Sequence, residues 1–229
     1  MGSRLRSRHA SKDHGRVRST GLAMTLSTLE LVDYRRRVAK IYGDVLDSGV
    51  GQQRWERWRD ARTKLLLTHV QSPVGDRDQF GSELPYFDYD PSWSVVGTVE
   101  PLAPGDTPAK MAEGSSILNQ IGWVSFQRQG ENHRLGLFWL DAYGGGLMLP
   151  FRDETNRSST YGAGRYLLDG AKSADLGSGG VGQLVLDFNF AYHPSCMWDP
   201  QWACPLAPPS NHLQVAVEAG EQMPVSAAS

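Results

Sequence analysis

The sequence predicts a mainly β protein of the α+β class, an antiparallel β-barrel or sandwich with two N-terminal helices packed on its outside. Helical periodicity is confined to residues 27–69. From Ser72 onward, short alternating runs rich in β-branched and aromatic residues are separated by Gly and Pro. A length of 229 residues with 21% charged residues fits one globular domain, which we place at residues 25–223.

Residues 1–24 form a basic arm that we expect to be disordered, because it has no hydrophobic period. Residues 1–23 carry six basic side chains against one acidic side chain, a charge of +5, so a total of −2 leaves −7 on the rest. We favour a native start at Met24, since a helix signal follows directly; an anion-binding arm and a transit peptide are the alternatives. The acidic remainder argues against a nucleic-acid partner.

Two helices are predicted before the β region. The first begins at Ser27, where Ser27 and Glu30 match a capping box, and it ends within residues 43–49. The second covers residues 52–67, and we interpret its Trp55 and Trp58 as packing against the sheet. The basic side of the second helix, which we expect to be solvated, comprises Arg54, Arg57, Arg59, Arg62 and Lys64.

The β region contains seven predicted strands with turn residues at their ends. The strands are residues 93–100, 122–128, 134–142, 147–152, 160–168, 183–190 and 213–218. Glycine-containing turns at 129–132 and 143–146 join three of them into a meander. Residues 102–115 and 169–182 are expected to be long loops.

The chain contains no run of 18 apolar residues and no apolar segment typical of a signal peptide, so we expect no membrane span. Two cysteines in 229 residues match the usage of cytoplasmic proteins. We therefore expect a soluble, cytoplasmic protein.

Polar side chains are concentrated in the predicted strands between residues 147 and 205, where solvation alone does not explain them. If the strands are neighbours, these side chains line one pocket for a small anionic ligand, in which Arg165 holds a carboxylate or phosphate. The alternative is a buried Asp–Arg network that fixes a turn. The candidate ligand-binding residues are Asp153, Tyr161, Arg165, Asp187 and Asn189.

Cys196 and Cys204 admit three interpretations. The first is a structural pair that forms a disulfide across the loop. The second is a zinc site, whose four ligands would be His193, Cys196, Cys204 and His212. The third is a nucleophilic Cys196 with His193 as its base. We rank them in this order, and we predict no other cofactor.

The segments PFRDETNRSSTYGAGRYLL (150–168), VLDFNFAYHPSCMWDPQWACPLAPPSNHL (185–213) and EAGE (218–221) are long and unusual. With them the chain resembles the bacterial domain-of-unknown-function family 1684. His193 stands where that family's pattern has asparagine, and His212 where it has arginine. These two departures argue against a zinc site common to the family, and the resemblance implies no particular activity.

Three functions stay open at this stage. The first is a small-molecule-binding β-domain. The second is a hydrolase-like enzyme that uses an aspartate or the Cys196–His193 pair, and the third is a non-catalytic structural or interaction module. The absence of the common catalytic motifs leaves enzymatic activity uncertain.

Overall fold

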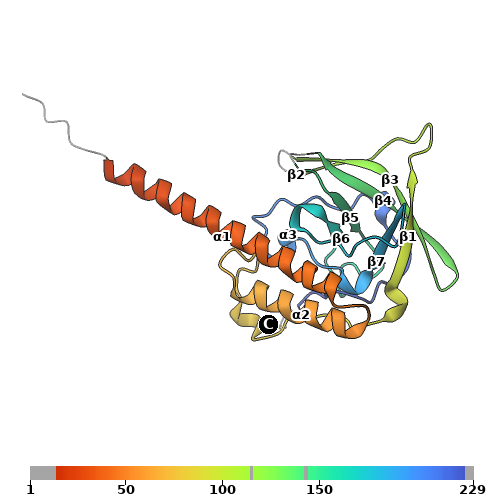
Figure 1. The fold of residues 1–229 in the computed structure, drawn as a ribbon, viewed down its shortest axis with the longest axis horizontal. Helices are drawn as coiled ribbons and strands as arrows, with labels where there is room; N and C mark the ends of the chain where they lie inside the picture. The colour runs from red at the N-terminus through yellow and green to blue at the C-terminus, as the bar shows by residue number, and fades with distance from the viewer. Residues whose placement is uncertain (1–13, 114–115, 142–143, 225–229) are drawn as a thin grey trace, which may run out of the picture.

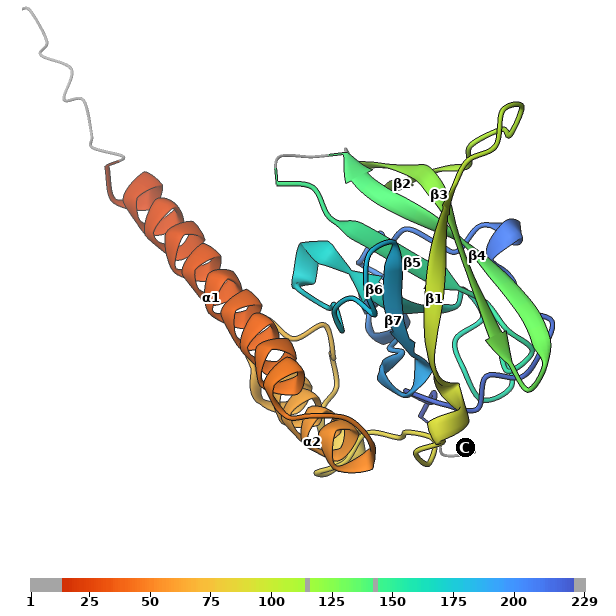
Figure 2. The ribbon, with the colours of Figure 1, turned by 45° about the vertical axis from the view of Figure 1, so that its right-hand side comes forward.

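The computed structural model describes residues 14–113, 116–141 and 144–224, and its main feature is one curled antiparallel sheet (Figures 1 and 2). Within these residues the strand order is β6-β5-β4-β3-β1-β7, with β2 paired to β3 at the side. The strands are β1 Ser94–Pro101, β2 Lys110–Glu113, β3 Ser116–Arg128, β4 Glu131–Asp141, β5 Leu147–Phe151, β6 Arg165–Asp169 and β7 Gln183–Asp187. The sheet forms a half-barrel, which confirms the predicted fold class.

Two long helices precede the sheet, α1 at His14–Asp47 and α2 at Gln52–Thr68. The second matches its prediction closely. The described chain also contains a short helix, α3 at Ser195–Trp198, and five 3-10 helices. These are η1 Asp78–Phe80, η2 Pro91–Trp93, η3 Gly170–Lys172, η4 Phe188–Phe190 and η5 Pro209–Asn211.

The first helix begins earlier than predicted. Residues 14–24, expected to be disordered, form its first turns, which project beyond the rest of the molecule (Figures 1 and 2). The Ser27 capping box is therefore wrong, because Ser27 and Glu30 lie inside the helix. The segment contains no proline, and a helix packed at one end gains one hydrogen bond for each residue added. Residues 1–13 of the predicted arm lie outside the described residues.

The helices pack on the sheet through a shared apolar cluster. It includes Val38 and Tyr42 of α1, Trp58 of α2 and Phe138 of β4. Trp58 is fully buried, and its ring centroid lies 5.1 Å from that of Phe190. The neighbouring Leu137 belongs to a second cluster, as the alternation of side chains along a strand requires.

The strands predicted at 160–168 and 213–218 differ most from the structure, and the strand predicted at 183–190 ends at Asp187, before η4. The strand expected at 160–168 begins only at Arg165, because residues 153–160 form a series of turns. The segment 213–218 is not a strand. Its Val217 bonds to side chains instead, with the amide donating to Asp153 and the carbonyl accepting from Arg165. Strand β2 was not predicted, because it lies in the loop expected at 102–115.

Among the described residues, none of the helices is both long enough and apolar enough to cross a bilayer.

Candidate functional site

Arg165, the first residue of β6, is fully buried, and both terminal nitrogens of its guanidinium donate hydrogen bonds, whereas Nε has no partner among the described residues. Its Nη2 donates to Asp153 Oδ2 at 3.0 Å and to Val217 O at 2.7 Å. Its Nη1 donates to the carbonyls of Ala219 and Glu221. Burial lowers the pKa of Arg165 from its usual value, and the Asp153 carboxylate opposes this change.

Asp153 anchors the turns that precede β6. Its Oδ1 accepts from the Thr155 amide at 2.9 Å, the Thr155 hydroxyl at 2.5 Å and the Val217 amide at 3.1 Å. Gly164, directly before Arg165, has φ +97°, and a Cβ there would lie 2.3 Å from Phe151 O, so glycine is needed where the chain passes close to β5. A buried ion pair needs such additional hydrogen bonds to offset its desolvation. The pair therefore acts as a structural clamp between the turns and the C-terminal segment.

Glu221 forms the centre of a second buried cluster, next to the first. Its side chain is 1% exposed and accepts from Arg62 Nε at 2.6 Å, from the His193 amide at 2.7 Å and from the Tyr86 hydroxyl at 3.4 Å. Burial acts to lower the pKa of Arg62, but Glu221 together with the neighbouring tyrosines Tyr86 and Tyr42 outweighs it and raises this pKa. The guanidinium also lies 4.4 Å from the centroid of the Tyr192 ring.

Sequence reasoning missed this second cluster. Arg62 and Arg54 were expected on a solvated face, and that expectation is wrong, because each residue is only 8% exposed. One feature of the sequence could have indicated that Arg62 is buried. It lies four positions after Trp58, and therefore on the side of α2 that carries the apolar residues. Glu221 lay within the EAGE motif, but the motif alone did not indicate its partner.

The predicted ligand-binding residues fall in three places. Asp153 and Arg165 form the clamp. Asp187 and Asn189 form a separate pair, in which Asp187 Oδ1 accepts from Asn189 Nδ2 at 2.8 Å. Asn189 in turn exchanges hydrogen bonds with the backbone of Asp90. Burial raises the pKa of Asp187, although the hydrogen bond from Asn189 opposes the rise.

Tyr161 is half-buried and lies beside the two cysteines, because the Cys196 thiol is in hydrogen-bonding contact with its side chain. Three surface grooves on the described part of the chain are lined by residues other than these five. The structure therefore gathers Asp153 with Arg165, and Asp187 with Asn189, but it does not gather all five around one of these grooves.

His193 is fully buried, with Nε2 accepting from the Tyr161 amide at 3.2 Å. Burial, reinforced by Arg165 and Arg62, holds the pKa of His193 well below its usual value. An imidazole nitrogen that already accepts an amide proton is poorly placed to take a thiol proton. This geometry gives the Cys196–His193 nucleophile no support.

The four proposed zinc ligands do not converge. His212 is exposed, and its Nε2 lies 3.3 Å from Glu154 Oε1. Across the described ranges, no three His, Cys, Asp or Glu side chains are grouped so as to hold a metal ion. Cys196 and Cys204 are half-buried free thiols, and the Cys196 amide donates to Cys204 Sγ at 3.3 Å.

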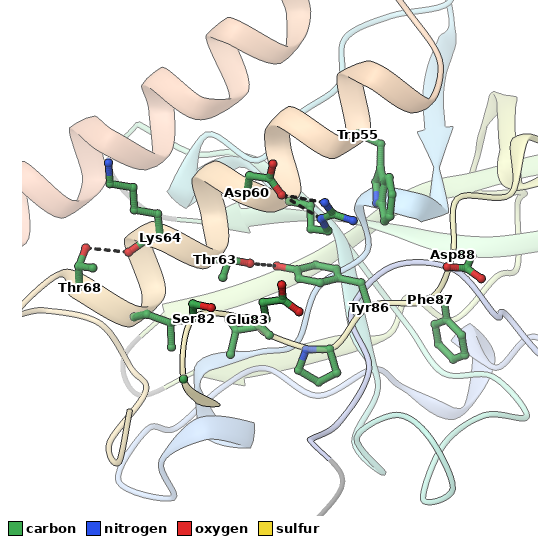
Figure 3. A pocket seen from close by; sticks show the side chains of 15 residues that line it. Trp55, Asp60, Thr63, Lys64, Thr68, Ser82, Glu83, Tyr86, Phe87 and Asp88 are labelled. Atoms are coloured by element: carbon green, nitrogen blue, oxygen red, sulfur yellow. Dashed lines mark hydrogen bonds and ion pairs between the residues drawn. The ribbon is translucent and has the colours of Figure 1, made fainter. Parts of the chain in front are cut away.

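A groove of about 750 Å³ lies between α2 and residues 81–88, and we call it the α2 groove (Figure 3). The two segments run in opposite directions, so Thr68 and Ser82 lie at one end and Trp55 and Asp88 at the other. Tyr86 joins the groove to the buried cluster, since its hydroxyl contacts both Thr63 and Glu221. The charged residues that line the groove are Arg59, Asp60, Lys64, Glu83 and Asp88.

Fold and site together define a class: an antiparallel β half-barrel with N-terminal helices, held by buried ion pairs beside a surface groove. The chain belongs to the family described as protein of unknown function (DUF1684), whose model matches residues 79–222. This confirms the resemblance drawn from the motifs between residues 150 and 221.

Among solved structures, the chain is similar to an uncharacterized protein of Haloarcula marismortui, determined in solution by NMR. The two are 34% identical, the match covers 76% of this chain and 95% of the other, and the TM-score is 0.56. No curated protein matches the chain. Neither of the two descriptions names an activity or a ligand.

Proposed function

We propose that this protein is a small-molecule-binding β-domain and that the α2 groove is its binding site. The observation that carries this proposal is the groove itself, whose volume of about 750 Å³ lies within the range of small-molecule sites. It combines aromatic walls with a few charged groups, the composition that such sites share.

The buried clusters support this proposal by making the groove rigid. The Arg62–Glu221 ion pair attaches α2 to the C-terminal segment, and Tyr86 contacts the same carboxylate from the opposite wall. Both walls of the groove are therefore tied to one buried group. A site that is preformed in this way avoids the ordering cost that a flexible loop pays on binding.

The charges favour a small ligand that carries a carboxylate or similar anion next to a planar body. Arg59 forms an ion pair with Asp60 at 2.9 Å. Lys64, the other cation of this lining, is exposed and forms no ion pair with a carboxylate of the described residues. Asp88 lies at the other end of the groove, where its carboxylate would accept a hydrogen bond from an amino group of the same ligand (Figure 3). We further propose that the protein acts in the cytoplasm, which suits its two unbonded thiols.

Ligand-observed NMR with aromatic carboxylates, aromatic amines and aromatic amino acids tests the site in the full chain. We expect carboxylates to bind the wild type, and Ser82→Trp, which fills the groove from an exposed position, to abolish their binding. Lys64→Glu weakens carboxylate binding by about fivefold, the scale of an exposed ion pair.

The matched controls are Gln79→Trp and Arg57→Glu, which make the same changes at exposed positions outside the lining. Both should bind like the wild type. Binding that survives Ser82→Trp, or a folded wild type that binds no probe, contradicts the proposal.

A further inference from the structure

The loop that carries Cys196 and Cys204 holds two reactive groups at close range outside the groove. The cysteines are eight positions apart, and the Cys196 amide hydrogen-bonds to the Cys204 sulfur at 3.3 Å. Both side chains are half-buried, so small oxidants reach them while the chain stays folded. Neither sulfur is in a disulfide, and the described chain gives them no metal-binding group of three or more ligands.

We propose that Cys196 and Cys204 are a reversible oxidation site, which a peroxide or a small-molecule disulfide converts to an intramolecular disulfide. The proposal does not depend on ligand binding in the α2 groove. Its basis is geometric: the loop already brings one sulfur against the backbone of the other cysteine, so little backbone movement is needed to join them.

With a peroxide, the atoms balance in two steps. The Cys196 thiolate attacks one peroxide oxygen, the O–O bond breaks, and the second oxygen leaves as water after it takes a proton. The resulting sulfenic acid is attacked by Cys204, which loses its proton as the S–S bond forms and a second water leaves. Two thiols and one hydrogen peroxide thus become one disulfide and two waters.

The order of attack follows from the surroundings of the two thiols. Burial raises the pKa of Cys204 to about 11, so its reactive thiolate is scarce near neutral pH. Cys196 is therefore the first thiol to react, and Cys204 resolves the intermediate. Burial and the neighbouring Cys196 also raise the pKa of Tyr161, which remains a neutral phenol beside this pair.

The disulfide would hold a segment that also contacts the rest of the fold. Trp198, within the loop, packs edge-on against Phe80 with ring centroids 5.6 Å apart. At the far end of the loop, the Tyr166 hydroxyl donates to Pro205 O at 2.6 Å. A disulfide between Cys196 and Cys204 would add a covalent restraint to this segment, which has little regular structure.

The test is to treat the full-length protein with hydrogen peroxide or oxidised glutathione under native conditions, then to measure intact mass and free thiols. We expect a monomer that has lost two hydrogen atoms, a thiol count that falls from two to none, and its full return with dithiothreitol. Peptide mapping after proteolysis should link Cys196 to Cys204.

Two single variants separate the roles of the thiols. Cys204→Ser should accumulate a sulfenic acid or a glutathione adduct on Cys196. Cys196→Ser should react more than about tenfold more slowly, because burial, the main cause of the raised pKa of Cys204, is unchanged in this variant.

Three results would overturn the proposal. One is that both thiols stay reduced while the urea-unfolded chain is oxidised under the same conditions. Another is that only intermolecular disulfides form. The third is that the purified protein holds one zinc per chain that protects both thiols from oxidation.

Discussion

Arg62 and Glu221 lie 159 positions apart in the chain, yet Arg62 Nε meets Glu221 Oε1 at 2.6 Å with both side chains almost completely buried. The contact joins α2 to the end of the family segment, although α2 itself lies outside the matched residues 79–222. This ion pair is the point where α2, the C-terminal segment and, through Tyr86, the opposite wall of the α2 groove meet.

Replacing Arg62 by methionine should destabilise the protein by about 3–5 kcal/mol, because it leaves the Glu221 carboxylate buried without its cation. Urea unfolding measures the change. Arg57→Met, at an exposed position of the same helix, is the control and should stay within about 0.5 kcal/mol of the wild type. The double variant Arg62→Met with Glu221→Gln should recover part of the loss. If Arg62→Met is as stable as the wild type, the ion pair between Arg62 and Glu221 does not stabilise the fold.

Arg165 provides the test that separates a structural role from ligand binding. Arg165→Lys keeps the charge but cannot reproduce two guanidinium nitrogens that serve Asp153 and three carbonyls together. We expect a loss of about 3 kcal/mol in urea unfolding, since buried acceptors lose their donors. Binding of carboxylate probes to the variant that remains folded should be unchanged. Normal stability with lost binding would instead make Arg165 part of a ligand site.

Local pattern was sufficient to predict the antiparallel meander, because alternating runs and glycine turns determine that β3, β4 and β5 pair in chain order. It did not predict that β1 pairs with β7, which closes the other side of the curled sheet. It failed where side chains replace backbone pairing. The segment around Val217 has the composition of a strand, but its amide and carbonyl are taken by Asp153 and Arg165. Hydrophobic periodicity is a local property, so it cannot indicate a hydrogen-bond partner that lies more than fifty positions away in the chain.

The candidate site was predictable in part for the same reason. Asp153 and Arg165 stood out as charges within apolar runs, and one interpretation of them, a buried Asp–Arg network, describes their geometry. The Arg62–Glu221 pair gave only a weak signal, the position of Arg62 on the apolar side of α2, because arginines on an amphipathic helix are usually solvated. The α2 groove depends on how α2 and residues 81–88 pack together, which is a tertiary property that neither segment specifies alone.

His193 makes the stability depend on pH in a predictable direction. Its pKa in the folded protein is depressed by burial and by the positive charges of Arg165 and Arg62, while its ordinary value is 6.5. Between these two values the unfolded chain binds more protons than the folded one, so stability falls as the pH drops below about 6.5. Glu221 lies on the other side of the ring, with Oε2 3.6 Å from His193 Nδ1.

The measurement is urea unfolding of the wild type and of His193→Asn between about pH 5 and pH 8. The variant keeps a polar side chain at this position and removes the titrating group. Its stability should change less over this range than that of the wild type. His212→Asn, at an exposed histidine, is the control and should keep the wild-type slope. Equal slopes for wild type and His193→Asn would mean that His193 titrates normally in the folded protein.

Oxidation of Cys196 and Cys204 should stabilise the fold by about 2–3 kcal/mol, the value expected from the entropy that a short closed loop removes from the unfolded chain. Thermal and urea unfolding of the peroxide-treated protein, with and without dithiothreitol, measure this difference. Cys196→Ser provides the control, because it cannot form the bond and should show no difference between oxidised and reduced samples. If the oxidised wild type is less stable than the reduced form, the bond strains the folded loop, and the pair would then favour the dithiol. A gain near the expected value would show that the loop between Cys196 and Cys204 is already arranged to accept the bond.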